Sequence, residues 1–403
     1  MMQRQVMAGL LAMGLTLAAS AQSIDSPNLQ ASIARDNARH FGDDPVDPGP
    51  IATDLSPAMK KAEVRKAMRK VADWQLARSE PYFDRIWTWS VLYSGFMATS
   101  DTLGDAKYRD AMYAMGKKFD WQLRNKKPNA DDQSVGQTYL ELYLQAKGAA
   151  RDKGMILPTQ NDLDEAITTP DDPKRIPWWW CDALFMAPPV WVRMYEATGD
   201  GKYLDYMNKE WGETYDLLWD KDEHMYARDA AFIPKLAPNG KKIFWSRGEG
   251  WVMGGLVRVL EFLPKDDPRR PFYVQQLRDM SARVIELRDK DGLWHASLLD
   301  AEDFPEAEIS GSALMTYAMA WGVNEGVLEG GKYRPVVEKA WAGMLRHIYA
   351  DGRLGGIQQT GAEPAHYRAS ASYTYGVGAF LLAGSEVDRM ARGAAGKGKH
   401  RHK

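Results

Sequence analysis

The segment from Arg175 to Tyr203 carries the residues best suited to acid–base chemistry. Asp182 follows three consecutive tryptophans and Cys181, where the pattern predicts the start of a helix. A carboxyl group walled by aromatic rings is poorly hydrated, which raises its pKa and makes it a usable general acid near neutral pH. The alternative is that Asp182 only caps the helix. We expect Cys181 to be a small packing residue, because no histidine lies near it in the sequence.

Two adjacent carboxylates form a second candidate site. Asp131 and Asp132 stand at the start of a predicted helix over residues 132–148. Aspartates at such a position are often simple caps that interact favourably with the helix dipole. The pair is therefore only a weak indication of chemistry when taken alone.

A third candidate site combines a cation with aromatic rings. Arg247 and Trp251 are four residues apart and share one face of a predicted helix. Arginine binds carboxylates through two parallel hydrogen bonds, so an arginine with aromatic neighbours suits an acidic sugar. The alternative is that Arg247 belongs to a buried structural ion pair. Gly248 and Gly250 allow the backbone to approach a ligand closely.

Helical patterns fill the chain around these candidates. Ser56 and Pro57 form a helix start signal, and Val64, Met68 and Val71 then recur at helical spacing. Further helices are predicted over residues 85–100, 105–122, 132–148, 180–197, 201–218, 246–263, 270–288, 309–324, 331–349 and 370–388, with another possible over 162–168. No βαβ alternation and no GxGxxG motif are present, which excludes all-β and Rossmann folds.

A weak repeat indicates how the helices are joined. Gly104–Tyr108 recurs as Gly199–Tyr203 and, more faintly, as Gly330–Tyr333. Each copy lies between two helical stretches and is typical of a hairpin turn, in which glycine ends one helix and tyrosine packs the next. About six such hairpins predict a closed all-α toroid, formed by one domain over residues 56–390.

The N-terminus has the pattern of a secretory signal peptide over residues 1–21. Arg4 precedes an apolar stretch from Val6 to Ala19, and small residues precede Gln22. The apolar stretch is shorter than the roughly 20 residues of a membrane anchor. We therefore expect cleavage near Ala21–Gln22, a periplasmic or secreted protein, and no membrane association afterwards.

Two further segments are predicted to lie outside the domain. Residues 22–55 are rich in Asp, Pro and Ser and are predicted to form an extended arm. Residues 391–403 are predicted to be a disordered basic tail, in which His400 and His402 are solvated rather than bound to a metal.

Composition limits the class of partner. Lys and Arg total 52 against 54 Asp and Glu, so a net charge of -2 argues against nucleic acid or an anionic membrane as the main partner. The single cysteine excludes an intrachain disulfide and a cysteine-based metal site. Fifteen tryptophans and eighteen tyrosines exceed ordinary use for this length, and flat aromatic rings suit the faces of sugars.

Seven segments, taken together and in order, form a specific set. They are Trp87–Gly95, Asp131–Asp132, Trp180–Asp182, Trp245–Trp251, Asp291–Trp294, Glu306–Ala313 and Tyr375–Ala383. The set resembles the unsaturated glucuronyl and galacturonyl hydrolases of glycoside hydrolase families 88 and 105, and most of all the unsaturated rhamnogalacturonyl hydrolases of family 105. It extends over nearly the whole predicted mature chain.

The resemblance implies an (α/α)6 barrel and catalytic roles for two aspartates. Asp182 falls on the family's general acid/base, and Asp131 falls on its second active-site aspartate, with Asp132 as the alternative register. Arg247 and Trp251 match the pair that faces substrate in the family.

Further substrate contacts follow from the same resemblance. Trp87, Trp180 and Trp251 would line the sugar pocket, and Arg247 or Arg228 would pair with the uronate carboxylate. Two positions depart from the family: Glu249 replaces a frequent Asn, and Arg228 replaces a frequent His. These departures suggest that the second sugar is recognised differently. His224, His295 and His366 remain possible site members that no motif aligns.

The implied reaction removes a 4,5-unsaturated uronic acid from the non-reducing end of an acidic oligosaccharide by hydration of its double bond. It requires no metal and no organic cofactor. Unsaturated galacturonyl-rhamnose is the first expectation for the substrate, followed by unsaturated glucuronyl-rhamnose. The alternatives are an inverting glycosidase or a polysaccharide lyase on the same toroid, or a sugar-binding protein without activity. The sequence leaves the oligomeric state open.

Overall fold

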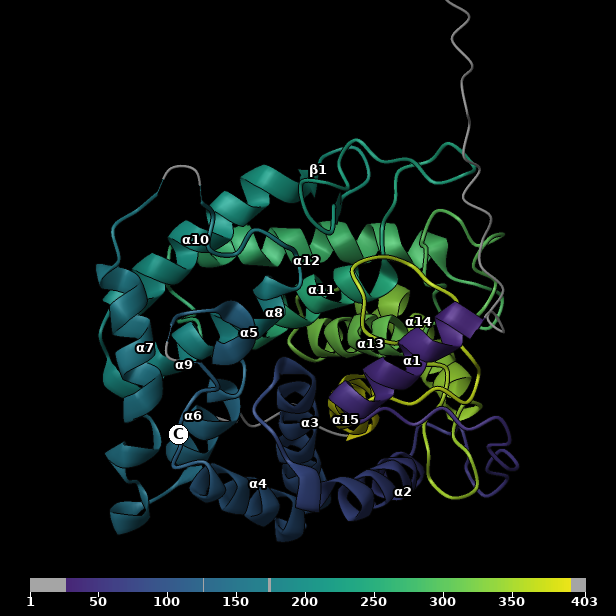
Figure 1. Cartoon of the computed structure of the whole chain (residues 1–403), viewed down its shortest axis with the longest axis horizontal. Coiled ribbons are helices and arrows are strands. Elements are labelled where there is room, and N and C mark those ends of the chain that lie inside the picture. Colours follow the sequence, from purple (N-terminus) through teal and green to yellow (C-terminus); the bar gives the residue numbers. More distant parts are fainter. Residues whose placement is uncertain (1–26, 126, 173–174, 393–403) are drawn as a thin grey trace, which may run out of the picture.

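The computed structural model describes residues 27–125, 127–172 and 175–392 of the chain. Within these ranges the helices pair into six hairpins arranged as a ring, with one helix of each hairpin inside and the other outside (Figure 1). The predicted all-α (α/α)6 barrel is therefore confirmed. The predicted signal peptide, and the tail beyond Arg392 with His400 and His402, lie outside the described residues.

The outer helices are partly exposed and carry the amphipathic patterns found in the sequence. They are α2 (Lys61–Ser79), α4 (Ala106–Lys118), α7 (Leu157–Thr168), α10 (Lys202–Leu218), α12 (Arg270–Val284) and α14 (Gly330–Leu345). Short 3-10 turns accompany them at Glu80–Tyr82, Gly148–Ala150, Lys153–Met155 and Ile285–Leu287.

The inner helices are buried on nearly all sides because they pack against both neighbours in the ring and against the outer layer. They are α3 (Trp87–Leu103), α6 (Gly136–Gln145), α9 (Pro188–Thr198), α11 (Ser246–Leu260), α13 (Ile309–Asn324) and α15 (Thr374–Arg392). Every residue of α11 is buried. The short helices α5 (Ala130–Gln133) and α8 (Ala183–Met186) precede α6 and α9, and strands β1 (Trp219–Asp220) and β2 (Met225–Tyr226) pair antiparallel.

Glycines allow the ring to close and its inner helices to approach one another. A Cβ on Gly378 in α15 would lie 2.2 Å from the carbonyl oxygen of Val91 in α3. A Cβ on Gly255 in α11 would lie 2.1 Å from the carbonyl oxygen of Leu184 in α8. Real Cβ atoms do not come so close to backbone, so only glycine permits these two contacts.

The repeated turns fit the expectation at two of three places. Gly104 and Gly199 end α3 and α9 in the left-handed conformation, with φ of 65° and 74°. In the third copy Gly330 instead begins α14, and the left-handed residue is Gly326 at φ 71°. The spacing of the third copy therefore did not locate the helix end.

Several predicted boundaries are wrong for local reasons. The first barrel helix begins at Lys61 rather than at Ser56 and Pro57. The predicted helix over 132–148 breaks between α5 and α6, and the one over 180–197 breaks at Ala187, before two consecutive prolines. Pro188 and Pro189 have no N–H to donate to carbonyl groups of the preceding turn, which explains the second break.

The predicted extended arm contains a helix, α1 (Pro27–His40). The Asp, Pro and Ser residues that suggested extension lie mainly on either side of this helix, whose own sequence contains good helix formers such as Ala, Leu, Gln and Arg. Figure 1 shows α1 in purple across the face of the ring, in front of α13 and α15. No helix among the described residues has the length and apolar character needed to cross a membrane.

Candidate active site

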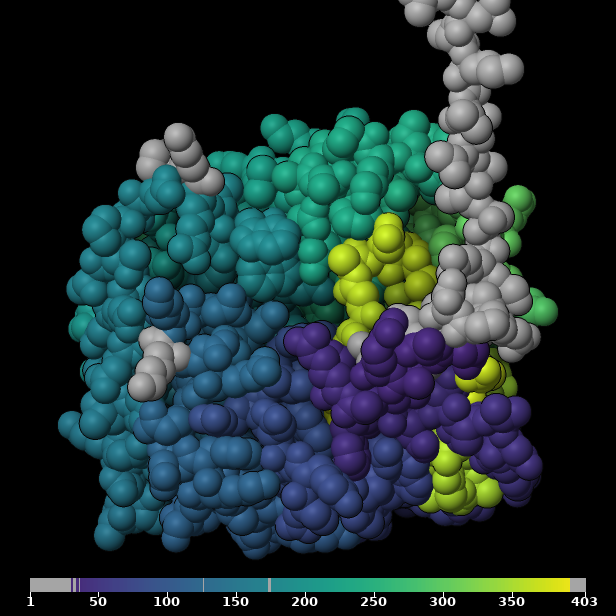
Figure 2. All heavy atoms as spheres, in the orientation of Figure 1, coloured from purple at the N-terminus to yellow at the C-terminus, as the bar shows by residue number. Residues whose placement is uncertain are grey.

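A cavity of about 220 Å³ lies at the end of the ring where the inner helices begin. Five of the residues singled out in the sequence line it: Trp87, Asp131, Trp180, Asp182 and Arg228. The remaining wall comes from Met186, from the α1 residues Arg39 and His40, and from Thr360 and Gly361 on the loop before α15. Figure 2 shows α1 in purple beside this yellow-green loop on the same face of the molecule.

Asp182 precedes α8, but its side chain makes no capping hydrogen bond. The segment before it pairs with a distant one: the Cys181 N–H donates to the Arg228 carbonyl at 2.9 Å, and Trp180 forms a bridge with Asp229. This pairing brings the Asp182 carboxylate to the Arg228 guanidinium, with Oδ2 and Nε 3.3 Å apart. The cap alternative for Asp182 therefore does not describe this structure.

The two adjacent aspartates of α5 face different surroundings. Asn129 caps α5 by accepting the Asp131 N–H at 3.0 Å, so neither aspartate is needed as the cap. Asp131 lines the cavity, whereas Asp132 is 6% exposed, is absent from the cavity wall and accepts a hydrogen bond from Asn125. The structure thus brings Asp131, not Asp132, to Asp182.

The two cavity aspartates hold protons at higher pH than ordinary carboxyls. Burial, followed by the charges of Asp182 and Asp132, raises the pKa of Asp131 to about 7, against the opposing effect of Arg228. Burial also raises the pKa of Asp182, while the Arg228 guanidinium lowers it. Since the charge of Asp182 raises the pKa of Asp131, the two carboxyls can divide the roles of general acid and general base near neutral pH.

The aromatic residues form two layers. Trp87 and Trp180 line the cavity directly. Trp251 is fully buried behind Trp87, with ring centroids 6.0 Å apart at an angle of 90°, and it also packs on Phe185. Trp251 therefore supports the wall and does not face the cavity.

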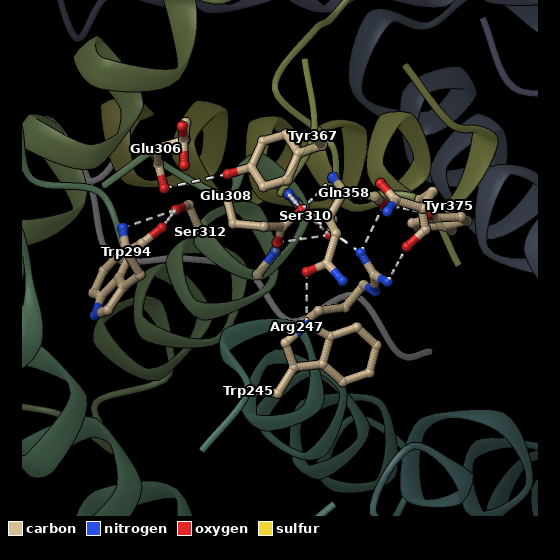
Figure 3. A network of polar contacts seen from close by, with 12 residues as sticks. Trp245, Arg247, Trp294, Glu306, Glu308, Ser310, Ser312, Gln358, Tyr367 and Tyr375 are labelled. Carbon is tan, nitrogen blue, oxygen red and sulfur yellow. Dashed lines mark hydrogen bonds and ion pairs between the residues drawn. The ribbon is translucent and has the colours of Figure 1, made fainter. Parts of the chain in front are cut away.

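Arg247 is placed differently from the expectation that it contacts substrate. It is fully buried, and its Nη1 and Nη2 donate to the carbonyl oxygens of Gln358 and Gln359 at 2.8 and 2.7 Å (Figure 3). Its guanidinium also lies 3.7 Å from Glu308 Oε1. The structure therefore shows the buried ion pair that was the alternative.

This ion pair fixes the loop that carries Thr360 and Gly361. The Glu308 carboxylate accepts the N–H groups of Ser310 and Gly311 at the start of α13, and also the Gln358 N–H at 3.1 Å. The Gln358 side chain is held as well, by Trp245 Nε1 at 2.9 Å. Arg247 thus holds the carbonyl groups of Gln358 and Gln359, and Glu308 holds the Gln358 N–H. These two glutamines directly precede the cavity residues of the loop.

Glu249, the other departure from the family pattern, does not line the cavity either. It is fully buried, and both of its carboxyl oxygens accept the Tyr226 N–H at 3.0 and 3.1 Å. Burial raises the pKa of Glu249 well above its ordinary value, and the charge of Asp182 adds to the effect. Burial likewise raises the pKa of the Cys181 thiol, in keeping with a packing role.

The three histidines that the sequence left open do not line the cavity, but a different histidine does. His224, His295 and His366 are absent from its wall, whereas His40 is part of it. Arg39 and His40 were missed because they lie in the segment predicted to be an extended arm. Their one signal was the helical composition of residues 27–40.

Comparison with known proteins places the chain in a family. The model of Glycosyl Hydrolase Family 88 matches residues 57–391. A curated relative from Formosa agariphila, named unsaturated 3S-rhamnoglycuronyl hydrolase, is 39% identical over 351 residues, which cover 82% of this chain and 92% of the relative.

Two solved structures are similar over most of their length. A family 88 glycosyl hydrolase from Bacteroides vulgatus has a TM-score of 0.77 and 30% identity, covering 82% of this chain and 99% of that one. A protein described as a polysaccharide lyase has a TM-score of 0.77 and 29% identity, covering 84% and 99%. The family resemblance found in the sequence is confirmed: the chain belongs to glycosyl hydrolase family 88 and is a glycoside hydrolase.

Proposed function

We propose that the protein removes a 4,5-unsaturated uronic acid from the non-reducing end of a short oligosaccharide. The observation that supports this most is the pair of cavity carboxyls, Asp131 and Asp182, whose raised pKa values suit one acid and one base near neutral pH. The name of the Formosa agariphila relative describes an enzyme of the same kind.

In the proposed reaction Asp182 donates its proton to C4 of the double bond, and the water oxygen adds at C5. Asp131, or Asp182 once it is ionised, accepts the proton that this water loses. The resulting hemiketal opens, and the hemiacetal at C1 then expels the neighbouring sugar as an alcohol and leaves an open-chain keto acid. One water molecule is consumed, and the two carboxyl groups together hold as many protons at the end as at the start.

The cavity wall suggests roles for three further residues. Trp87 and Trp180 offer flat faces to the sugar rings, and Arg228 lies where it can interact with both Asp182 and an anionic substrate. We propose a uronate linked to rhamnose as the substrate, in line with the relative's name, with the galacturonyl or the glucuronyl epimer at the end.

The test compares matched unsaturated and saturated disaccharides. Unsaturated uronates absorb ultraviolet light and lose this absorbance on hydration, so the wild-type protein should abolish the signal and release rhamnose from the unsaturated compound alone. Release of rhamnose from the saturated compound at a similar rate would contradict the hydration mechanism and favour an ordinary inverting glycosidase.

A polysaccharide lyase is the second candidate, favoured by the lyase description of one similar structure. The two activities change the same signal in opposite directions, because a lyase creates the C4=C5 bond that the hydrolase consumes. A rise in absorbance on an intact acidic polysaccharide, with none lost from unsaturated disaccharides, would support the lyase.

We also propose that the protein is exported, on the basis of the signal peptide pattern before Gln22. Expression of the full chain followed by N-terminal sequencing should yield a mature protein that begins at or near Gln22. An intact Met1 on the active protein in the native host would contradict export.

A further inference from the structure

Helix α1 contributes to the cavity although it lies outside the segment that matches the family, which begins at residue 57. Arg39 and His40, in the last turn of α1, are part of the cavity wall. The helix lies across the face of the ring in Figure 1, and its atoms stand beside the loop near residue 360 in Figure 2. The last turn of a helix favours cations, because the helix dipole is negative there.

The residue after α1 fixes the helix end to the barrel. Phe41 adopts the left-handed conformation with φ 57° and packs on Trp89 at 5.0 Å between ring centroids. The Arg78 guanidinium lies 4.4 Å from the centre of the Phe41 ring. The His40 ring is buried and lies 6.3 Å from the Trp87 ring, so α1 contacts the aromatic cavity wall itself.

The next residues attach the same segment to the loop before α15. Asp43 and Ser372 exchange two backbone hydrogen bonds of 2.9 and 2.8 Å. The Asp44 carboxylate accepts hydrogen bonds from Arg368 and from Ser370 Oγ, each at 2.9 Å. These contacts hold the C-terminal end of α1 in a defined position at the cavity.

Arg39 differs from the other two arginines near the site in the partners of its guanidinium group. Arg228 already lies beside Asp182 and donates to Asp229 at 2.8 Å, and Arg247 is committed to carbonyl groups of the loop. In the described part of the chain, no carboxylate lies within ion-pair distance of Arg39, which is exposed at the cavity edge. Its positive charge is therefore available to a ligand.

We propose that Arg39 binds an anionic oxygen group of the substrate, which makes α1 a specificity element added to the family barrel. The group is either the carboxylate of the terminal uronate or an anionic substituent, such as a sulfate ester, on the neighbouring sugar. The inference rests on the proposed function for the substrate class, since both sources belong to an acidic oligosaccharide.

The experiment measures binding separately from turnover. Arg39→Gln and Arg39→Lys are compared with Arg35→Gln, which removes an exposed charge from the same helix but not from the cavity wall. Each is combined with Asp182→Asn to prevent turnover and titrated by calorimetry with two unsaturated disaccharides, one with a neutral and one with a sulfated second sugar. Circular dichroism checks that the fold is retained.

We expect Arg39→Gln to weaken binding about 10- to 100-fold, as for loss of a charge-assisted hydrogen bond, with partial recovery in Arg39→Lys and no loss in Arg35→Gln. Loss with both disaccharides identifies the uronate carboxylate, and loss with the sulfated one alone identifies the substituent. Equal affinities for Arg39→Gln, Arg35→Gln and the parent would overturn the inference. A wild-type protein that leaves the ultraviolet absorbance unchanged would contradict the proposed function instead.

Discussion

Arg228 is the cation that limits how far the pKa values of the two cavity carboxyls rise. Its Nε lies 3.3 Å from Asp182 Oδ2, and it lowers the pKa of both Asp182 and Asp131. Arg228→Gln removes this charge and retains much of the side-chain volume. An opposite charge at such a distance changes a carboxyl pKa by about one to three pH units. We expect the lower end of this range, because Asp229 and solvent already share the guanidinium.

The direction in which the pH profile of kcat should move follows from the general-acid and general-base roles of the two carboxyls. The acid limb of the rate profile reports the carboxyl that must be ionised, and the basic limb reports the one that must be protonated. Removing the cation raises both pKa values, so both limbs of kcat should move toward alkaline pH by about one unit. The pair titrates as a unit, so the limbs belong to the pair and not to either residue alone.

The assay is the initial rate of ultraviolet absorbance loss at saturating substrate between about pH 4 and pH 10. Arg228→Lys is the matched control: it retains the charge, so its limbs should stay near those of the wild type even if its rate falls. Limbs of Arg228→Gln that coincide with those of the wild type would refute the assignment of Arg228 as the controlling cation.

Three further predictions test the remaining placements. Asp131→Asn should lower kcat about 10²–10⁴-fold, and Asp132→Asn far less, as measured by the same absorbance assay; equal losses would contradict the assignment. Glu249→Gln should raise the free energy of unfolding above that of the wild type, by an amount that grows with pH. The reason is that Glu249 has a raised pKa only in the folded protein, so unfolding of the wild type releases a proton and becomes easier as pH rises. Urea unfolding of both proteins at about pH 5 and pH 9 measures the difference. Arg247→Met should cost about 3–5 kcal/mol of unfolding free energy by leaving Glu308 buried without its cation, whereas a rise in KM at unchanged stability would restore Arg247 as a substrate contact.

The sequence predicted the barrel well because its helices depend on local patterns. The stretch over 309–324 matches α13 at both ends, since Glu308 caps it and apolar residues fill it. The breaks inside the inner layer were harder to predict, because α5 and α8 are single turns whose geometry depends on neighbours. At Ala187 the following prolines were visible in the sequence and could have located the break.

The composition of the cavity could be predicted only in part, because much of it depends on contacts between distant residues. The expectation that Asp182 is poorly hydrated is correct, although Trp180 is the only one of the three preceding tryptophans that lines the cavity. The pairing of Cys181 with Arg228 spans many residues and has no local signal. The same limit applies to α1, whose helix could have been expected from its residues but whose position across the cavity could not.

Glu249 shows how one substitution can be misinterpreted when its surroundings are unknown. If position 249 faced a sugar, a carboxyl in place of Asn would change the hydrogen bonding and the charge there. On that basis the substitution suggested altered recognition of the second sugar. In the structure it lies beneath the site, where both oxygens accept the Tyr226 N–H and burial raises its pKa, which favours the neutral form. A neutral carboxyl offers an acceptor and a donor, as an amide does, and so fits the position without adding a third negative charge beside Asp182. Differences in sugar recognition are therefore better sought at Arg228 and at α1, which line the cavity.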